Sequence, residues 1–246
     1  MREKQSQNHR TASSRKQEEA SFLAHCDIFG HLNSAEVSAL ERITTVITCP
    51  PGRIFYRPGD QGSTLFLLNT GRVQLYHLST DGRKLVTATL GAGTYFGEQP
   101  LLGQRVYTSF AEAIEPSQVG VMTSHDVENL LTQKPEIALA LLRVMGQRLV
   151  QLEAQLIDTT FKGTPARLAT LLLQLAHQQG NTLVVEGLSH EELAERLGVY
   201  RETVSTALRE LKDMGAIALG RKHITISEPA RLQEIAASLG IRNTNA

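Results

Sequence analysis

Residues 188–226 constrain the fold most, because their pattern is typical of a helix-turn-helix followed by a β-hairpin wing. Ser189 is a favourable N-cap, and Glu192 follows at the spacing of a capping box. Gly198 then ends the first helix where a tight interhelical turn is needed. A second helix is predicted to open near Tyr200, and it carries apolar residues at helical spacing: Val204, Leu208 and Leu211.

The opposite stripe of the second helix carries guanidinium, carboxylate and hydroxyl groups. Arginine can donate two hydrogen bonds to guanine, glutamate can accept one from cytosine, and hydroxyls can hold phosphates. Two β-type runs then flank a basic turn, which a hairpin would place beside a phosphate backbone. The alternative, a solvated helix pair in an α-helical core, does not account for the wing. The candidate DNA-binding residues are Ser189, Tyr200, Arg201, Glu202, Thr203, Ser205, Thr206, Arg209, Arg221 and Lys222.

Charge and composition narrow the class of protein. The 246 residues carry a formal net charge of zero, so any DNA binding has to be local and oriented. Cys26 and Cys49 form no pattern typical of a zinc site, and we expect reduced thiols, no bound metal and a cytoplasmic location. We find no signal peptide, bilayer-spanning apolar run, nucleophile elbow or Walker loop. These absences favour a protein that is neither an enzyme nor bound to a membrane.

Glycine and proline residues mark turns that divide the chain into further segments. Short β-type runs between Val46 and Met122 are separated by turns, among them Asp81-Gly82, and they predict an antiparallel β-roll. The fold class is therefore α+β. The predicted parts are a disordered tail at 1–18, an effector-sensing β-roll domain at 19–135, a dimerisation helix and hinge at 136–163, and a winged-helix domain at 164–240.

A heptad pattern of apolar residues runs through the helix predicted over residues 124–160. Its members recur at alternating steps of three and four, which favours a homodimer seam over packing against the chain's own roll. The candidate interface residues are Leu142, Met145, Leu149, Leu152 and Leu156. Residues 162–165 form a predicted hinge, and Pro165 suits the first turn of the next helix, which is expected to end near Gly180.

This order of parts resembles the Crp/Fnr family of bacterial transcription regulators. The resemblance covers residues 20–235, and it rests on the motifs PGD at 58–60, LLNTGRV at 67–73, YFGE at 95–98 and GVYRETVS at 198–205. It implies a cyclic-nucleotide-binding type of roll, a long helix paired across a two-fold axis, and contacts from Arg201 and Glu202 in the major groove. It also implies an RNA polymerase partner.

The resemblance breaks down at the effector pocket. Cyclic-AMP-responsive members grip the phosphate with an arginine followed by serine or threonine, and alignment places Tyr107 and Thr108 there. A phenol cannot neutralise a phosphate as a guanidinium does. Arg105 lies two residues earlier, on the same face of an extended strand, and is a possible substitute. The candidate pocket residues are Phe96, Gly97, Glu98, Arg105, Tyr107 and Thr108.

The sequence therefore disfavours cyclic AMP as effector. Two cysteines are too few for an iron–sulfur cluster, and no cofactor is assigned. A small anion such as an oxoacid, another cyclic nucleotide, a nucleotide alarmone or no ligand remain open. The predicted function is that of a homodimeric, sequence-specific regulator of transcription on two-fold-symmetric double-stranded DNA. The alternatives are a ligand-independent regulator with a vestigial pocket and a nucleotide-sensing regulatory subunit.

Overall fold

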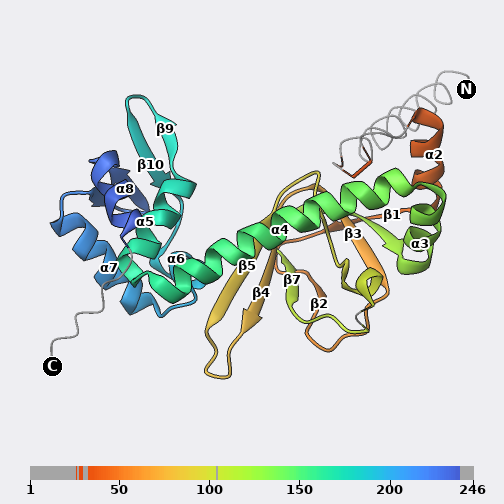
Figure 1. Cartoon of the computed structure of the whole chain (residues 1–246), viewed down its shortest axis with the longest axis horizontal. Coiled ribbons are helices and arrows are strands. Elements are labelled where there is room, and N and C mark those ends of the chain that lie inside the picture. The colour runs from red at the N-terminus through yellow and green to blue at the C-terminus, as the bar shows by residue number, and fades with distance from the viewer. Residues whose placement is uncertain (1–25, 27, 30–32, 104, 239–246) are drawn as a thin grey trace, which may run out of the picture. The chain divides into compact units, whose positions relative to one another are not determined.

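The computed structural model describes residues 26, 28–29, 33–103 and 105–238, so the predicted tail of residues 1–18 lies outside the described residues. Contacts divide the chain into two compact units (Figure 1). One contains residues up to 76 together with 87–146, and the other contains residues 77–86 together with 147–246.

The first described helix, α2 (Ser34–Ile43), begins with a reciprocal cap. Asn33 Oδ1 accepts a hydrogen bond from the Glu36 amide at 3.0 Å, and Glu36 Oε2 accepts one from the Asn33 amide at 2.9 Å. Two of the unpaired amides at the helix start are thereby satisfied.

Eight strands form the predicted antiparallel roll, as two four-stranded sheets of order β1-β8-β3-β6 and β2-β7-β4-β5. The Asp81-Gly82 turn joins β4 to β5, with Gly82 at φ +83°, as its sequence predicts. The strands are β1 (Thr45–Cys49), β2 (Ile54–Tyr56), β3 (Thr64–Thr70), β4 (Val73–Leu78), β5 (Lys84–Leu90), β6 (Tyr95–Phe96), β7 (Phe110–Ala113) and β8 (Ser117–Thr123). A short 3-10 helix, η1 (Gln99–Leu102), follows β6.

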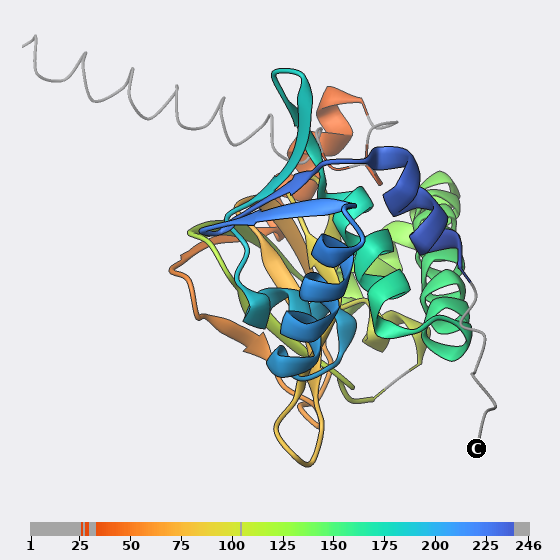
Figure 2. The same cartoon turned by 90° about the vertical axis from the view of Figure 1, so that its left-hand side faces the viewer.

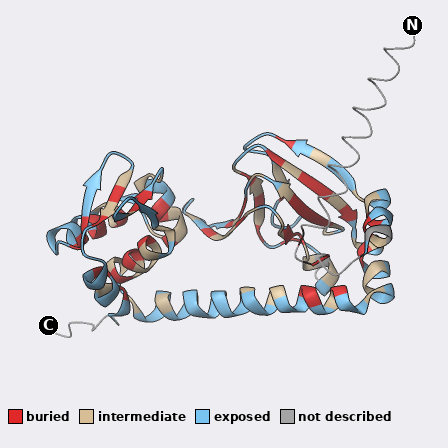
Figure 3. Cartoon of the chain, turned by 90° about the horizontal axis from the view of Figure 1, so that it is seen from above, coloured by how far each residue is buried: buried red, intermediate tan, exposed pale blue. Residues whose placement is uncertain are grey.

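The helix predicted over residues 124–160 is two helices, α3 (Ser124–Gln133) and α4 (Pro135–Phe161). The break falls at Lys134 because Pro135 disfavours a helical conformation in the residue before it. Proline is tolerated in the first turn of a helix, so a second helix begins there. Figure 3 shows α4 mostly in the colour of exposed residues, with the buried ones near its N-terminal end.

The second unit contains the predicted winged helix. Its helices are α5 (Thr164–Leu175), α6 (His190–Leu197), α7 (Arg201–Asp213) and α8 (Pro229–Ala237). Its sheet has the order β11-β12-β10-β9, made of β9 (His177–Gln179), β10 (Thr182–Glu186), β11 (Ile217–Gly220) and β12 (His223–Ile226). Figure 2 looks onto this unit, with α7 and the strands β11 and β12 in blue.

One prediction for this unit is wrong. The helix expected to reach Gly180 ends at Leu175, and residues 177–186 form an antiparallel hairpin. The other apolar patterns agree with the structure, because the predicted faces of α6 and α7 meet in one core. Among its fully buried members are Leu168, Leu172, Leu193, Val204, Leu208 and Leu211.

Candidate nucleic-acid interface and effector pocket

The helix-turn-helix begins with the capping box that the sequence predicts. Ser189 Oγ accepts a hydrogen bond from the Glu192 amide at 3.2 Å, and Glu192 Oε2 accepts one from the Ser189 amide at 2.7 Å. The interhelical turn depends on Gly198, whose φ of +66° lies in the left-handed region. The box and the glycine together fix the start and the end of α6.

An arginine that sequence reasoning missed also supports this turn. Arg167, on α5, donates a hydrogen bond from Nη2 to the carbonyl oxygen of Leu197, the last residue of α6. The side chain is half-buried, and this burial lowers the pKa of the Arg167 guanidinium. The signal available in the sequence was an arginine within a helix whose other residues are mostly apolar.

Helix α7 has the predicted amphipathic arrangement. Its N-cap is Tyr200, and its apolar side is buried in the core. Four candidates on its polar side are exposed: Arg201, Glu202, Thr206 and Arg209. Thr203 and Ser205 are partly buried beside them. The helix therefore presents guanidinium, carboxylate and hydroxyl groups on one accessible face. A major groove is wide enough to admit an α-helix.

Two hydroxyl groups of α7 are bonded to its own backbone. Ser205 Oγ donates to the Arg201 carbonyl at 3.0 Å, and Thr206 Oγ1 donates to the Glu202 carbonyl at 3.1 Å. A second residue missed in the sequence, His190, lies with its ring Nδ1 2.9 Å from Ser205 Oγ. Its position directly after the cap of α6 was the available signal.

The Tyr200 side chain is already engaged within its own unit. Its hydroxyl donates to Asp81 Oδ2 at 2.6 Å, and the Arg83 guanidinium lies 5.1 Å from the ring centroid. The hydrogen bond and the negative charge of Asp81 raise the pKa of Tyr200. Hydrogen bonds from Ser79 and Tyr200 lower the pKa of Asp81. A hydrogen bond donated by the Tyr200 hydroxyl to a DNA phosphate would have to replace this bond.

The wing is a two-residue hairpin, since Gly220 pairs with His223 across Arg221 and Lys222. Both basic side chains are exposed, and Lys222 has a left-handed φ of +52°. Behind them, His223 Nδ1 lies 3.0 Å from Glu186 Oε1 on β10. The hydrogen bond from His223 lowers the pKa of Glu186. The turn that carries Arg221 and Lys222 is therefore supported by a side-chain contact between β12 and β10.

In the roll, Tyr107 occupies the position where the family resemblance expects a phosphate-binding arginine. Its side chain is 4% exposed, and its ring stacks on Tyr56 with the centroids 3.8 Å apart. Its hydroxyl donates to the Thr64 carbonyl at 2.9 Å, and burial raises the pKa of the phenol. The phenol therefore packs in the roll's core and is bonded to backbone.

The other candidate pocket residues differ in their exposure and in their hydrogen-bond partners. Arg105 is exposed, whereas Tyr107 is buried. The segment between them is a loop with one isolated bridge at Val106, not a regular strand. Thr108 Oγ1 accepts from Gln99 Nε2 at 2.9 Å, and its amide donates to Gln99 Oε1 at 2.9 Å. Gln99 thus binds both the hydroxyl and the backbone amide of Thr108.

Phe96 and Gly97 have structural reasons for their positions. Phe96 is 0% exposed and stacks on Phe66, with the ring centroids 4.9 Å apart. Gly97 has a φ of +80°, and a Cβ there would lie 2.8 Å from Phe66 and 2.9 Å from the Thr64 carbonyl oxygen. Glu98 is partly buried next to them. The fold alone accounts for Phe96 and Gly97.

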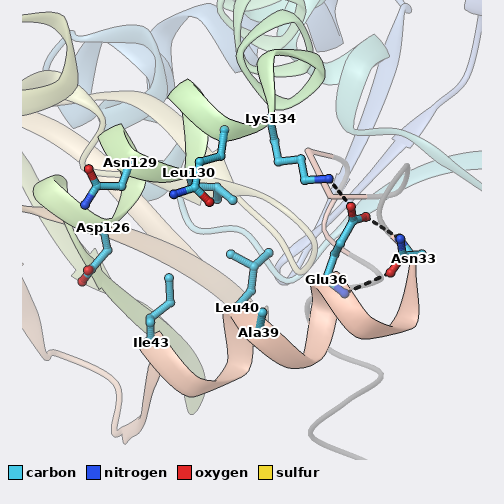
Figure 4. Close-up of a pocket in the computed structure, with 10 residues that line it drawn as sticks. Asn33, Glu36, Ala39, Leu40, Ile43, Asp126, Asn129, Leu130 and Lys134 are labelled. Carbon is cyan, nitrogen blue, oxygen red and sulfur yellow. Dashed lines mark hydrogen bonds and ion pairs between the residues drawn. The ribbon is translucent and has the colours of Figure 1, made fainter.

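A groove of about 550 Å³ lies between α2 and α3, apart from the candidate pocket residues (Figure 4). Leu40, Ile43 and Leu130 supply apolar surface, and an ion pair between Lys134 and Glu36 closes one end. Among the described residues, no three His, Cys, Asp or Glu side chains are grouped to bind a metal ion. None of the helices described is long and apolar enough to cross a bilayer.

The predicted seam lies along α4. Four of its leucines, at positions 142, 149, 152 and 156, are 49–67% exposed, and Met145 is partly buried. Val150, Ile157 and Phe161 are also exposed, so the apolar surface is wider than the predicted stripe. A solvent-exposed apolar surface of this length is typical of a helix that packs against a partner.

Comparison with known proteins identifies both the helix-turn-helix domain and the domain that contains the roll. The family model of the Crp-like helix-turn-helix domain matches residues 166–235, and that of the cyclic nucleotide-binding domain matches residues 46–134. A CRP-like cAMP-activated global transcriptional regulator of Mycobacterium tuberculosis is 32% identical over 86% of this chain and 96% of that protein. The cyclic AMP receptor protein of Thermus thermophilus is 32% identical over 77% of this chain and 87% of that protein. The crystal structure of a CRP-family transcriptional regulator from Thermus thermophilus aligns with a TM-score of 0.64 and 25% identity, over 78% of this chain and 97% of that chain.

Proposed function

The chain belongs to the Crp/Fnr family of DNA-binding transcription regulators, and from this premise we propose that it acts as a homodimer on two-fold-symmetric operators. Its relatives are regulators, not enzymes. The proposed division is an effector-sensing domain at 19–135, a dimerisation helix and hinge at 136–163, and a DNA-binding domain at 164–240. RNA polymerase is the proposed protein partner, and the cytoplasm is the proposed location.

The proposal of a homodimer rests on the exposed apolar stripe of α4. Leu149 is 58% exposed and Leu156 is 67% exposed, although the cores of both units are well buried. Pairing two copies of α4 would bury this stripe and would place two recognition helices on one duplex. Half-sites one helical turn apart, about 34 Å, match such a pair.

The proposed DNA contacts divide by chemistry. Arg201, Glu202 and Arg209 are assigned to base edges from the major-groove face of α7. Arg221 and Lys222 at the wing are assigned to phosphates. Ser189, whose hydroxyl donates to Glu192 Oε2 at 2.7 Å, is assigned to positioning the start of α6 beside the DNA. DNase footprinting of the full chain on promoter DNA, with its oligomeric state measured in parallel, tests this function. A monomer without a footprint at low salt would overturn it.

Mutation of the wing gives a prediction of its own. Lys222→Ala should weaken binding to operator and to random DNA by the same factor, because a phosphate contact carries no sequence information. The slope of log affinity against log salt should fall by about one. Fluorescence anisotropy across a salt series measures both quantities.

Controls separate charge from backbone geometry at this position. Lys222→Gly suits the left-handed φ and removes the same charge, so it should behave as the alanine variant does. Arg53→Ala removes an exposed cation from the first unit and should change neither quantity. A loss at Lys222 confined to the operator would contradict the phosphate assignment.

For the effector, we propose that cyclic AMP is not bound, although the relative from Mycobacterium tuberculosis is cAMP-activated by name. The support is Tyr107, which has no positive charge and already uses its hydroxyl on the Thr64 carbonyl. A small anion, another cyclic nucleotide or a nucleotide alarmone would need a different set of contacts. The buried stack of Tyr107 on Tyr56 also favours the second candidate, a ligand-independent regulator.

Calorimetry distinguishes these alternatives. Titration of the full chain with cyclic AMP should give no binding heat, since no guanidinium at position 107 is present to pair with the phosphate. A panel of cyclic dinucleotides, alarmones and oxoacids follows under the same conditions. Heat with a panel member identifies the effector class, whereas silence across the panel supports the ligand-independent form. Saturable cyclic AMP binding would overturn the assignment.

A further inference from the structure

The hydroxyl groups of Ser205 and Thr206 can only accept hydrogen bonds from outside the protein in this arrangement. A hydroxyl has one hydrogen to donate and two lone pairs. Ser205 donates its hydrogen to the Arg201 carbonyl at 3.0 Å, and Thr206 donates its hydrogen to the Glu202 carbonyl at 3.1 Å. Such bonds to the carbonyl four residues earlier are a common arrangement of these side chains within helices.

His190 reinforces this state at Ser205. Its Nδ1 lies 2.9 Å from Ser205 Oγ. Because Ser205 gives its hydrogen to the Arg201 carbonyl, the hydrogen between the two side chains has to come from the imidazole. We therefore assign a hydrogen to Nδ1 of the imidazole, which donates to Ser205. This contact fixes Oγ from the α6 side and leaves it one free lone pair.

The free lone pairs restrict which DNA atoms these residues can bind. Phosphate oxygens, thymine O4, guanine O6 and the purine N7 atoms all accept hydrogen bonds. The donors that the major groove offers are the amino groups of adenine N6 and cytosine N4. An acceptor-only hydroxyl can pair with those two groups and with none of the acceptors.

We infer that Ser205, positioned by His190, and Thr206 select adenine or cytosine through the exocyclic amino group and do not bind phosphate. This inference rests on the proposed binding of α7 in the major groove. Glu202 is also an acceptor when ionised, so residues 202, 205 and 206 form one acceptor-only surface. Arg201 and Arg209, which only donate, flank it along the helix. The half-site should therefore place guanine opposite the arginines and an amino-bearing base between them.

The experiment begins with operators selected by the full chain from a random duplex pool. In the selected half-site, nebularine replaces each adenine, and 2-pyrimidinone replaces each cytosine, which removes one exocyclic amino group at a time. Affinities are measured for the wild type, Thr206→Val and Ser205→Ala. One base position per hydroxyl should lose about two- to tenfold in affinity, the range of a single hydrogen bond.

The decisive measurement is the affinity of each variant for each operator that carries a base analogue. At the contacted base, Thr206→Val or Ser205→Ala should lower affinity on the natural base but cause no further loss on the analogue, because both changes remove the same bond. Thr206→Ser keeps the hydroxyl and should retain the base preference. Thr132→Val removes a similar backbone-bonded hydroxyl from α3 and should leave every affinity unchanged.

His190 is a positioning residue in this scheme, and its test is rescue. His190→Ala should reduce discrimination at the base that Ser205 contacts and at no other. His190→Asn places an amide donor near the position of Nδ1 and should restore that discrimination. A purely structural role would instead lower affinity equally at all positions and would not distinguish the two variants.

Two results would overturn the inference. One is additive losses from variant and analogue at every adenine and cytosine. The other is a Thr206→Val or Ser205→Ala variant that weakens operator and random DNA alike and lowers the salt slope, which is the signature of a phosphate contact. Failure of the proposed function looks different, because the selection would then recover no operator at all.

Discussion

Leu149→Glu should convert the protein to a monomer and reduce operator affinity by at least about a hundredfold. The side chain is 58% exposed in the middle of the α4 stripe, so the substitution leaves the fold of the single chain in place. In a dimer the carboxylate would be buried in an apolar seam, where an unpaired charge is costly. Each half-site would then be bound separately, and the effective concentration supplied by the second subunit would be lost.

Sedimentation velocity measures the change in mass, and fluorescence anisotropy on an intact operator measures the loss of affinity. Gln151→Glu is the matched control, because it adds the same charge to an exposed position of α4 outside the heptad stripe. It should remain dimeric with unchanged affinity. A Leu149→Glu protein that stays dimeric would show that α4 is not the seam.

Arg201→Ala should cost about 1–3 kcal/mol of operator binding and relax sequence preference at one base pair. Arg201 is the first residue of α7, the proposed recognition helix, and its side chain is exposed. A guanidinium there can donate two bonds to guanine, and alanine can donate none. Affinity for random DNA should fall far less than affinity for the operator.

Two further variants separate charge from bond geometry. Arg201→Lys keeps the charge but loses the planar fork, so it should retain the salt slope and lose most of the discrimination. Arg231→Ala removes an exposed cation from α8 in the same unit and should change neither. An Arg201→Ala protein with the wild-type footprint on promoter DNA would defeat the assignment.

Local chemistry made much of this fold predictable. The cap at Ser189, the left-handed turn at Gly198 and the Asp81-Gly82 hairpin each depend on the conformational preferences of a few neighbouring residues. The helical spacing of apolar residues also predicted which side chains are buried, since the apolar positions of α6 and α7 face one core. Such features need no knowledge of the remote parts of the chain.

Features that depend on tertiary context were missed. Strand β9 consists of exposed polar residues, His177–Gln179, so it carries no alternating pattern, and only pairing with β10 defines it. The burial of Tyr107 depends on Tyr56 and Thr64, which are more than forty residues away. The contact between His190 and Ser205 arises only when α6 and α7 pack together. No local propensity encodes these pairings.

The bond from Arg167 to the Leu197 carbonyl limits how the DNA-binding unit can deform. The guanidinium sits two residues after Pro165, close to the start of α5, and its acceptor lies three residues before the N-cap of α7. A displacement at the start of α5 that preserves this bond has to carry the interhelical turn with it. The N-terminal end of α7 is therefore connected to the segment that follows the long helix through a single planar cation.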